Sequence, residues 1–501
     1  MNIPFGFEKA HVPNAERRAG ARVAADASPP DEMLRRAPVP ISIRFARGIL
    51  PRAPPSRCAR AASMSSPEPA AHFLDAEEEL RVEVALGSSV VLTLVDGTAE
   101  IFGAELPKGA PVTLPGGKHA VFTWHGATLE MVGEPEICYS AKETPMVAYS
   151  NVEGIMEARR KEAAESSGRV SGPRIALVGP TDVGKSSLAK ILLNYAVRKG
   201  WAPTFADLDL GQGGITCPAT VGATPVDRPV DVAEGVPLEM PLVFFHGDAS
   251  PGNNPELYKY LVTRVGQMLD RRLDANPACD HAGVVVNTQG WVDGVGYKLL
   301  LHALDALKIT DVFVIGQERL HAQLHNDTRG KVAGGGESGE SKRVPRSVQV
   351  WKLPKSGGVV ERDAAFRRKC RDRKIREYFY GPGGDSLAPS SNTLPFGAVS
   401  IFKIGGGPKA PASALPIGQV SSNDPLRVTT VAPSMALLNS VLAVSHGKTQ
   451  AELLSSNVAG FVYVTEVDVA NGRFTYTSPC GGELPSRNLI AGSLKWIEAN
   501  A

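Results

Sequence analysis

The feature that most constrains what this chain can fold into is a glycine-rich segment of eight residues that follows a short apolar run. Residues 179–186 read Gly-Pro-Thr-Asp-Val-Gly-Lys-Ser and match the pattern G-x-x-x-x-G-K-[ST]. The run Arg174–Val178 precedes the segment, and apolar residues at helical spacing follow it. A glycine-rich loop between a strand and a helix binds phosphate, so the sequence predicts a nucleotide site in an α/β domain.

The residues of this loop have expected parts in holding a triphosphate. Glycines let successive backbone N–H groups face one anion, and the N-terminus of the following helix adds positive potential. Lys185 is expected to reach the β- and γ-phosphates, and the Ser186 hydroxyl is expected to ligate magnesium. The expected nucleotide-binding residues of the loop are Gly179, Pro180, Thr181, Asp182, Val183, Gly184, Lys185, Ser186 and Ser187.

The length of 501 residues exceeds what one hydrophobic core usually serves, so several domains are expected. Hydrophobic residues make up 43% of the chain and charged residues 21%, as is typical of globular proteins. The net charge of +2 is too small for a protein that coats a polyanion, so a nucleic-acid partner would need a local basic cluster. The pattern along the chain predicts four parts, which are a disordered basic extension (1–70), a β domain (71–160), a P-loop domain (161–385) and a C-terminal domain (386–501).

Residues 1–70 differ from the rest of the chain, because they are rich in Ala, Pro and Arg and lack sustained periodicity. Such a composition cannot bury enough apolar surface to offset chain entropy. Two interpretations stay open. The segment is either an organellar transit peptide, which its acidic residues argue against, or an extension upstream of a native start at Met64, which we favour.

Cysteine usage and hydropathy limit the class of protein. The cysteines are Cys58, Cys138, Cys217, Cys279, Cys370 and Cys480. They include no C-x-x-C pair, which argues against a zinc site or a disulfide framework and fits a reducing compartment. No apolar run approaches the roughly 20 residues of a membrane span, so we expect a soluble protein without a membrane partner.

Short strands separated by turns are predicted over residues 79–149. Residues 80–84 alternate between apolar and polar, and residues 90–95 are apolar. The turn signals are Asp96-Gly97, Gly116-Gly117 and His125-Gly126. The pattern indicates a small antiparallel β domain, which a helix over residues 152–167 joins to the next part.

From about residue 170 to 380, apolar strand candidates alternate with helical stretches, which argues for βαβ units and a parallel sheet covered on both faces. The strand candidates are Ile175–Val178, Thr204–Leu208, Val284–Asn287, Val312–Ile315 and Val348–Leu353. A Gly/Ser/Lys-rich insert, Thr328–Arg343, is expected to be a mobile surface loop. The C-terminal part is expected to be a smaller α+β domain with a β-hairpin around Asn471-Gly472.

Polar side chains follow two further strands of the predicted sheet. Asp207 and Asp209 end the second strand, at the edge where parallel sheets bind ligands. One acid could orient magnesium or its waters, and another could accept a proton from an attacking hydroxyl. A turn-capping role is the alternative, and it is weaker for Asp209 than for Asp207. Beyond the third strand, Trp291 could stack a nucleobase at about 1–3 kcal/mol or pack in the core, and the sequence favours neither.

A strongly basic stretch, residues 361–381, is predicted to be a helix. Arg367 and Arg371 are four residues apart and therefore share one helical face. Two guanidinium groups that close over a triphosphate could stabilise the charge on the transferred γ-phosphoryl, an effect of about 10³ or more in rate. A solvated charged helix is the alternative, and only the upstream P-loop favours the functional interpretation.

At these residues the sequence resembles the eukaryotic RNA 5′-hydroxyl kinase family that includes the cleavage-and-polyadenylation subunit Clp-one. The resemblance runs from about Glu79 to the C-terminus, and the matching stretches are GPTDVGKSS, LLNYAVRKG, DLDLGQGG, NTQGWVDGVGY, PKSGGVVER, IREYFYG, AEIFGAEL and AVFTWHG. It implies an N-terminal β-sandwich, a central P-loop kinase domain and a C-terminal domain. It also implies ATP and Mg²⁺ as cofactors and the 5′ end of RNA as the phosphate acceptor.

The same resemblance implies roles for individual residues. The implied catalytic residues are Lys185, Asp209, Arg367 and Arg371, with Asp209 as general base and the arginines in a lid. The implied metal ligands are Ser186 and Asp209. The implied adenine-binding residues of the β domain are Glu79 and Lys118, and the implied RNA-binding residues are Gln212, Thr288 and Trp291.

Departures from the family pattern and rival functions stay open. Pro218-Ala219-Thr220 stands where relatives read proline-glycine-threonine, and the insert precedes the lid. Some relatives have lost catalytic residues and serve as ATP-bound scaffolds, whereas here the residues implied in catalysis are all present, which favours an active enzyme. A switch-type ATPase or GTPase is a third hypothesis. The sequence lacks the guanine-binding signature N/T-K-x-D after its later strands, which argues against a GTPase.

The resemblance also implies a cellular setting. The expected location is the nucleus. The expected partners are subunits of the mRNA cleavage and polyadenylation factor, or the tRNA-splicing endonuclease.

Overall fold

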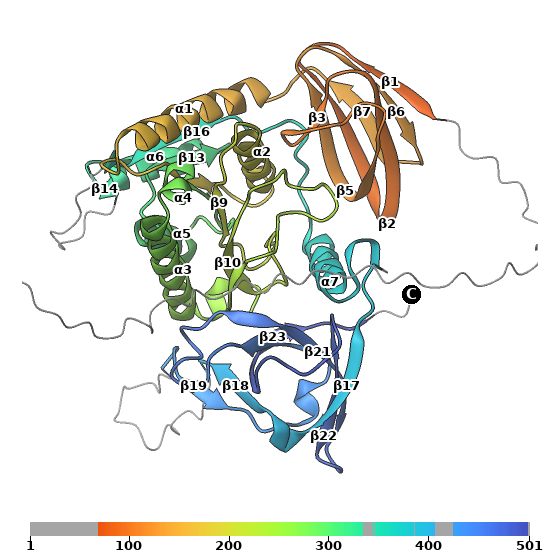
Figure 1. Ribbon diagram of the computed structural model, residues 1–501, viewed down its shortest axis with the longest axis vertical. Coiled ribbons are helices and arrows are strands. Elements are labelled where there is room, and N and C mark those ends of the chain that lie inside the picture. Colours follow the sequence, from red (N-terminus) through yellow and green to blue (C-terminus); the bar gives the residue numbers. More distant parts are fainter. Residues whose placement is uncertain (1–68, 334–343, 345, 385, 406–423, 499–501) are drawn as a thin grey trace, which may run out of the picture. The chain divides into compact units, whose positions relative to one another are not determined.

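The computed structural model describes residues 69–333, 344, 346–384, 386–405 and 424–498, and these belong to one compact unit that spans residues 66–501 (Figure 1). The predicted basic extension, apart from its last two residues, lies outside the described residues. Three seven-stranded sheets organise the described chain, and a small two-stranded sheet accompanies them.

The first sheet is antiparallel and folds over on itself as a β-sandwich, as predicted. Its strands are β1 (Ala70–Leu74), β2 (Glu78–Gly97), β3 (Glu100–Ile101), β4 (Ala104–Glu105), β5 (Pro111–Thr123), β6 (Ala127–Val132) and β7 (Ile137–Ala141). Strand β2 pairs with β7 along its first half and with β6 along its second half. An irregularity in the pairing of β2 with β5, between Val84 and Ser89, separates the two halves, because a bulge bends a strand.

Two of the three predicted turns in this domain are wrong. Asp96-Gly97 ends β2 and pairs with β6, so it is not a hairpin turn. Gly116-Gly117 lies inside β5, where a Cβ on Gly116 would meet the Ala85 carbonyl oxygen at 2.5 Å. These glycines permit a close approach of two backbones rather than a reversal of the chain. The third signal, His125-Gly126, lies between β5 and β6 as predicted.

The central sheet has seven strands in the order β11-β10-β9-β12-β8-β13-β16. The strands are β8 (Arg174–Val178), β9 (Thr204–Asp207), β10 (Thr220–Pro225), β11 (Leu242–Phe245), β12 (Val284–Asn287), β13 (Asp311–Ile315) and β16 (Gln349–Leu353). The five predicted strands are present and run parallel. Strands β10 and β11 were not predicted. At the β9 edge, β10 pairs antiparallel with β9 and β11 pairs antiparallel with β10, so the sheet is mixed. Antiparallel neighbours need no helical crossover, and the alternation of strands and helices therefore gave no signal for them.

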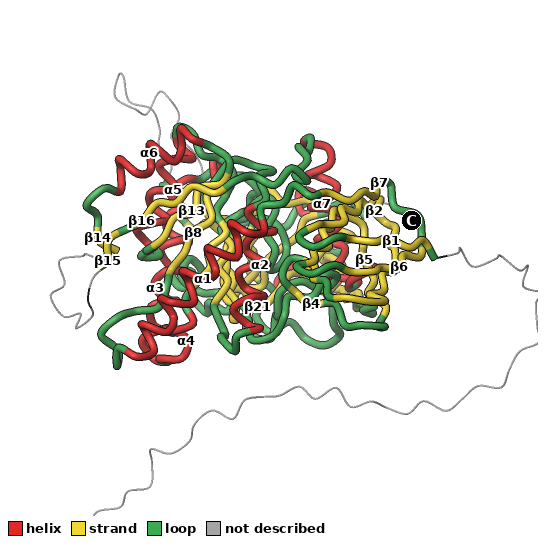
Figure 2. Tube along the Cα trace, turned by 90° about the horizontal axis from the view of Figure 1, so that it is seen from above, coloured by secondary structure: helices red, strands yellow, loops and turns green. Residues whose placement is uncertain are grey.

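Helices flank the central sheet (Figure 2). They are α1 (Met146–Glu165), α2 (Lys185–Arg198), α3 (Pro255–Ala275), α4 (Pro277–Ala282), α5 (Val295–Ala306), α6 (Glu318–Thr328) and α7 (Ala364–Tyr380), with a 3₁₀ turn η1 (Pro251–Asn253). On β8, Ile175 and Leu177 belong to the core that includes α1 and α2, whereas Ala176 and Val178 belong to the core that includes α3 and α5. Successive side chains of a strand point to opposite faces, so one apolar strand serves both cores.

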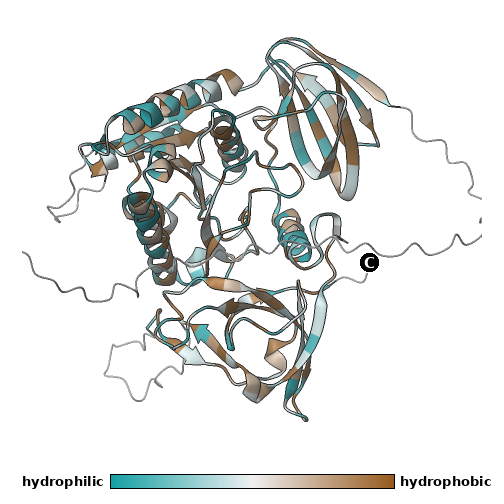
Figure 3. Ribbon diagram, in the orientation of Figure 1, coloured by the Kyte–Doolittle hydropathy of each residue, from teal (hydrophilic) through white to brown (hydrophobic). Residues whose placement is uncertain are grey.

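The predicted basic helix is α7. The carboxylate of Asp363 caps it by accepting a hydrogen bond from the Phe366 backbone N–H at 2.6 Å. Figure 3 shows the helix as mostly hydrophilic, and its buried residues are Ile375 and Phe379. The helix is therefore anchored through its C-terminal half.

After α7 the described residues form a third sheet in the order β17-β22-β21-β20-β23-β18-β19. Its strands are β17 (Ser390–Pro395), β18 (Ser400–Ile404), β19 (Val428–Thr430), β20 (Ser440–Ser445), β21 (Val458–Asp468), β22 (Arg473–Ser478) and β23 (Asn488–Lys495). The predicted hairpin is β21–β22, with Gly472 at φ +65° in the turn. The helical segments among the described residues here are 3₁₀ turns, η2 (Pro382–Gly384), η3 (Phe396–Ala398) and η5 (Met435–Leu437). The expectation of an α+β domain is therefore wrong for the described part, which is β.

The third sheet packs directly on the central domain. The Tyr378 hydroxyl of α7 accepts a hydrogen bond from the Phe461 N–H of β21 at 2.9 Å. Gly247, which follows β11, lies so close to Gly492 of β23 that a Cβ on Gly492 would be 2.1 Å from the Gly247 carbonyl oxygen. The Ser493 N–H donates to that same oxygen at 2.7 Å.

The start of the predicted insert is structured. Thr328 is the last residue of α6 and is buried, and β14 (Val332–Ala333) pairs with β15 (Arg346–Ser347). Residues 334–343, which carry most of the insert, lie outside the described residues.

The cysteines that the structure describes are all free thiols. No helix in the described part of the chain is long and apolar enough to cross a membrane.

Gly492→Ala is expected to lower the free energy of unfolding by about 1–3 kcal/mol, the usual cost of overpacking. The added Cβ would meet backbone, which cannot rotate away. Gly154→Ala is the matched control, because a Cβ there has nothing within 4 Å and alanine favours a helix by about 1 kcal/mol. Denaturant unfolding measures both changes, and equal stability of Gly492→Ala and wild type would contradict the close approach.

Candidate active site

The predicted P-loop connects β8 to α2. Gly179 and Gly184 have φ angles of +156° and +95°, and the second lies in the left-handed region that favours glycine. Asp182 adopts φ +55° as well, which is uncommon for a residue with a side chain. The backbone thus takes the curled form in which successive N–H groups can face one anion.

Lys185 begins α2 and its side chain folds back over the loop. Its Nζ donates to the carbonyl oxygens of Gly179 at 2.8 Å and Pro180 at 2.7 Å. Burial lowers the pKa of Lys185 to about 8, and the nearby carboxylates of Asp209 and Asp182 oppose that shift. The ammonium is therefore poorly solvated and poised to gain from an anion in the loop.

Asp207 ends β9 and is buried. Its Oδ1 accepts hydrogen bonds from the Asp209 N–H and the Asn287 side-chain amide, both at 3.1 Å, and its Oδ2 accepts from the Gly214 N–H at 2.6 Å. Burial, and next the charge of Asp209, raise the pKa of Asp207 to about 7. Asp207 therefore shapes the loop that follows β9 and does not line the cavity.

Asp209 faces the P-loop. Its Oδ1 accepts from the backbone N–H groups of Gly211 at 2.9 Å and Gln212 at 3.2 Å. Its Oδ2 forms no hydrogen bond among the described residues, so this oxygen is available to a ligand. The Gln212 side chain donates to the Arg367 carbonyl oxygen at 3.3 Å, which ties this loop to α7.

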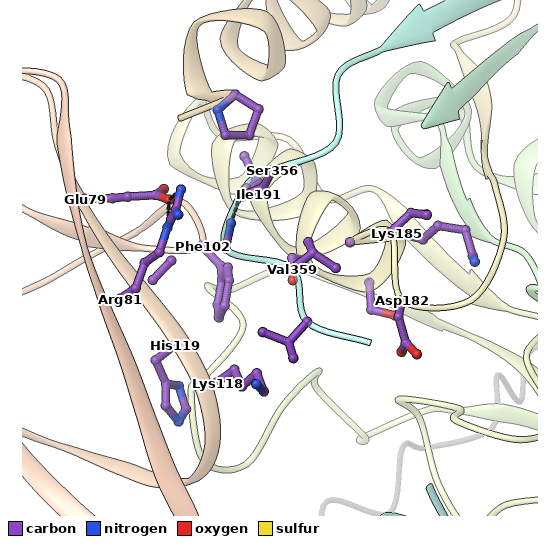
Figure 4. Close-up of a pocket in the computed structure, with 18 of the residues that line it drawn as sticks. Glu79, Arg81, Phe102, Lys118, His119, Asp182, Lys185, Ile191, Ser356 and Val359 are labelled. Carbon is purple, nitrogen blue, oxygen red and sulfur yellow. Dashed lines mark hydrogen bonds and ion pairs between the residues drawn. The ribbon is translucent and has the colours of Figure 1, made fainter. Parts of the chain in front are cut away.

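A cavity of about 220 Å³ extends from the P-loop to the β domain. Figure 4 shows Glu79 and Arg81 on the β-domain side and Asp182 and Lys185 on the P-loop side, with Phe102 between them. Twelve predicted residues line this cavity, and they are Glu79, Lys118, Thr181, Asp182, Val183, Gly184, Lys185, Ser186, Ser187, Asp209, Gln212 and Arg367. The structure thus brings together loops that are far apart in the sequence.

Both predicted adenine-binding residues have partners inside the β domain. Glu79 forms an ion pair with Arg81 at 2.5 Å and accepts a hydrogen bond from the Thr144 hydroxyl at 3.1 Å. Lys118 pairs with Glu83 at 2.7 Å. These pairs fix the polar side chains at one end of the cavity.

The lid arginines are not equivalent. Arg367 forms an ion pair with Asp182 at 2.7 Å, and the Arg362 N–H donates to the same carboxylate at 3.0 Å. Although burial opposes it, the Arg367 guanidinium lowers the pKa of Asp182. Arg371 is half-buried on α7 and does not line the cavity. The structure therefore places one of the two predicted arginines at the P-loop.

The strand-end motif after β12 lies beside the cavity rather than in its wall. Thr288 is buried and its hydroxyl donates to the Leu177 carbonyl oxygen at 2.8 Å. A Cβ on Gly290 would lie 2.7 Å from the Thr181 backbone nitrogen, so this motif contacts the P-loop. Trp291 is 41% exposed and lies against Gly296, which has no side chain and therefore leaves room for the indole ring.

Several lining residues were missed by the sequence reasoning. They are Phe102, His119, Tyr149, Ser356, Val359 and Arg362, among others. Two stretches were available signals, because both were singled out as matches without a role for these residues. PKSGGVVER contains the last three residues, and AEIFGAEL contains Phe102. His119 lies on β5 and Tyr149 on α1, and only the tertiary fold decides which side of these elements faces the cavity.

The residues present fit a magnesium ion. Among the described residues no cluster of three or more His, Cys, Asp or Glu side chains could hold a metal. The Ser186 hydroxyl and the Asp209 carboxylate nevertheless both face the cavity, and Asn287 Oδ1 is a buried oxygen without a hydrogen-bond partner at the same sheet edge. Oxygen donors in small number are what Mg²⁺ needs beside substrate phosphates.

Three protein-family models match the chain in order. They are the N-terminal beta-sandwich domain of polyadenylation factor (residues 73–163), the mRNA cleavage and polyadenylation factor CLP1 P-loop (179–381) and the Pre-mRNA cleavage complex II protein Clp1 (387–498). The chain is similar to a Protein CLP1 homolog of Arabidopsis thaliana, 49% identical over 432 residues, 85% of this chain and 94% of the relative. It is similar to the Polyribonucleotide 5′-hydroxyl-kinase Clp1 of Homo sapiens, 41% identical over 427 residues, 85% of this chain and 96% of the relative.

Solved structures share the fold. A Clp1p chain from a wild-type Clp1p–Pcf11p complex superposes with a TM-score of 0.70 at 22% identity, covering 87% of this chain and 100% of that chain. A second chain, from a study of the interface between Pcf11p and Clp1p, gives a TM-score of 0.71 at 22% identity, covering 86% and 99%. The three-part architecture is thus that of known structures, and the family's P-loop implies that the chain binds nucleotide.

Nucleotide affinity is expected to fall as pH rises above about 8. The charged form of Lys185 attracts phosphate, and its pKa is about 8 without ligand and higher with one, so each pH unit above 8 should weaken binding about tenfold. Calorimetric titration with ATP at pH 7, 8 and 9 measures the trend. Lys185→Met should bind weakly and without this slope. An unchanged affinity up to pH 9 in the wild type would contradict the argument.

Proposed function

The chain belongs to the Clp1 family of mRNA cleavage and polyadenylation factors, and from this premise we propose that it is an ATP-dependent kinase that phosphorylates the 5′-hydroxyl end of RNA. Relatives 41% identical over 85% of this chain bear the name polyribonucleotide 5′-hydroxyl-kinase. The observation that carries the proposal is that Lys185, Asp209 and Arg367 line one cavity although they come from three distant segments.

Asp209 is the proposed general base. Two backbone N–H groups hold its Oδ1 and thereby fix the carboxylate in the wall of the cavity, while its Oδ2 is left available to a ligand. A carboxylate that is positioned in this way can accept the proton of the ribose 5′-hydroxyl as that oxygen attacks phosphorus. The proton moves from the hydroxyl to Asp209, the new oxygen–phosphorus bond forms, and the bond to the β-phosphate oxygen breaks in line.

Lys185, Ser186 and Arg367 are the proposed stabilisers of phosphate charge. Lys185 would exchange its two carbonyl acceptors for phosphate oxygens, and Arg367 would turn from Asp182 toward the γ-phosphoryl. Ser186 and Asp209 would hold magnesium, which when bound neutralises charge on the β- and γ-phosphates. We propose that Arg371, one turn further along α7, meets the phosphates when α7 closes.

The acceptor RNA is proposed to lie at the carboxyl edge of the central sheet. Gln212 lines the cavity beside Asp209 and is suited to contact the terminal ribose. The exposed face of Trp291 is suited to stack a base. Thr288 takes a different part, because its hydroxyl is engaged by Leu177. It holds the strand end that carries Gly290 against the P-loop.

The adenine is proposed to lie at the β-domain end of the cavity. Glu79 and Lys118 are there as fixed ion-paired groups, and Phe102 offers an aromatic face. Aromatic faces and a few fixed polar groups are the usual way in which a pocket selects a base.

The cellular setting is also a proposal. The family descriptions name mRNA cleavage and polyadenylation, and the solved relatives are complexes with Pcf11p, which supports a cleavage-factor subunit of that kind as partner, in the nucleus. The tRNA-splicing endonuclease is proposed as a second partner. Affinity purification from nuclear extract tests both, and a tagged chain that is excluded from the nucleus would refute the location.

Asp209→Ala is expected to abolish RNA phosphorylation, with a loss of about 10²–10⁴ in kcat, while ATP still binds. The assay uses radiolabelled ATP and an oligoribonucleotide with a 5′-hydroxyl, and calorimetry measures ATP binding. Asp227→Ala, at an exposed loop aspartate, is the control and should keep full activity. Wild-type protein that binds ATP but never labels RNA would instead indicate a nucleotide-bound scaffold. Hydrolysis of ATP without any RNA would indicate a switch ATPase.

Arg367→Ala is expected to lower kcat by about 10³ with little change in ATP affinity, because it acts on charge that develops during transfer. Arg368→Ala is the matched control, since Arg368 is the neighbouring and exposed arginine on the same helix. Steady-state kinetics with the same oligoribonucleotide separate kcat from KM. An equal loss in both variants would mean that the helix supplies only general positive charge.

A further inference from the structure

A group of cationic side chains from three elements meets beside the nucleotide cavity. His119 lies on β5, Lys190 lies on α2, and Arg373 and Lys374 lie on α7. Arg373 reaches the β domain directly, because its guanidinium donates to the Gly116 carbonyl oxygen. None of these side chains has a role in the proposed phosphoryl transfer.

His119 is 9% exposed and lines the cavity. Its Nε2 lies 2.7 Å from the Pro115 carbonyl oxygen and must donate, since a carbonyl only accepts. Its buried Nδ1 has no hydrogen-bond partner among the described residues. Buried polar atoms without a partner are rare in native proteins and often mark a bound group.

Lys190 is the least compensated cation of the group. Its Nζ lies 5.6 Å from the centre of the Phe102 ring, and it forms no ion pair within the described part of the chain. Burial lowers the pKa of Lys190 to about 8, Lys374 and Arg373 lower it further, and Asp231 opposes them. Burial also lowers the pKa of His119, with smaller contributions from Lys190 and Arg373. Lys190 is therefore close enough to His119, Arg373 and Lys374 to be repelled by each of them.

The acidic groups nearby do not cancel this charge. Glu377 lies 3.3 Å from Arg373 and 3.9 Å from Lys374, so one carboxylate serves two cations. Asp231 is exposed, and its carboxylate caps the N–H groups of Ala233 and Glu234. A net positive charge is left in a half-buried place, which is unfavourable unless an anion shares it.

We propose that His119, Lys190, Arg373 and Lys374 form a second anion site, which binds a tetrahedral oxyanion of the phosphate type and is separate from the P-loop. An oxyanion there accepts hydrogen bonds from the ammonium and guanidinium groups, and His119 gains a proton on Nδ1 and donates to it. The same anion joins β5, α2 and α7. It therefore holds the helix that carries Arg367 in place over the P-loop.

The test measures anion binding with the P-loop already filled. The protein is saturated with magnesium and a non-hydrolysable ATP analogue, and inorganic phosphate or sulfate is then titrated by calorimetry. One further site is expected. In Lys190→Met its affinity should fall about tenfold or more, because one charged hydrogen bond is lost. Lys161→Met, at an exposed lysine of α1, should bind as the wild type does.

Sulfate is used to measure the pH dependence of binding, because its charge does not change between pH 7 and 9. Its affinity should be highest below about pH 8 and should fall as pH rises, since Lys190 loses its proton there and the bound anion favours the protonated form. The ring of Phe102 and the charged or titratable groups of His119, Asp231, Arg373 and Lys374 face Lys190. Lys190→Met should lack most of this slope.

A second variant keeps the proposal testable if Lys190→Met fails to fold. Lys374→Gln removes a half-buried cation of α7 and should also weaken sulfate binding by several-fold. A 5′-hydroxyl oligoribonucleotide that displaces sulfate would assign the anion to an RNA phosphate, whereas no displacement would assign it to free phosphate. The absence of a further binding event, or equal affinity in the wild type and both variants, would overturn the proposal. Failure of the ATP analogue to bind in the first step would count against the nucleotide site alone.

Discussion

The buried carboxyl of Asp207 joins the segments from which the site is built. One of its oxygens holds the Asp209 N–H and the Asn287 amide, and the other holds the Gly214 N–H. The ends of β9 and β12 and the loop that follows β9 are thereby fixed to each other. A buried carboxyl that has no water around it needs such hydrogen-bond donors. The loss of one of these hydrogen bonds would therefore weaken the positions of the other segments that the carboxyl holds. The position of Asp209 therefore depends on this buried neighbour, which holds its backbone N–H.

The sequence was most informative where local pattern and chemistry coincide. The P-loop, the five parallel strands and Asp209 follow from spacing alone, because strand, loop and helix are adjacent in the chain. Gly116-Gly117 was misread because a close approach of two strands and a tight turn use the same residue. No helix separates β10 from β9 or from β11, so the alternation of strands and helices did not predict these two strands. Glu79 and Lys118 could be named only through the family resemblance, because nothing local indicates that a β domain forms one wall of a nucleotide cavity.

Thr288 shows a second limit of sequence reasoning. A hydroxyl at a strand end has the right chemistry for a substrate contact, yet here it donates to Leu177 and is buried. Whether a polar group faces a ligand or satisfies the backbone depends on which way the strand end turns. The same holds for Arg367 and Arg371, which share a helical face but differ in what that face meets, since Arg367 pairs with Asp182 of the P-loop whereas Arg371 does not line the cavity.

Helix α7 has its two ends in different parts of the molecule. Near its start Arg367 pairs with the P-loop, and near its end Tyr378 bonds to β21 while the Phe379 ring stacks on Trp496 at 6.1 Å between centroids. A continuous helix of 17 residues transmits a push along its length as a stiff rod about 25 Å long. A protein that bound the C-terminal sheet could therefore shift the phosphate loop through α7 without contacting the nucleotide.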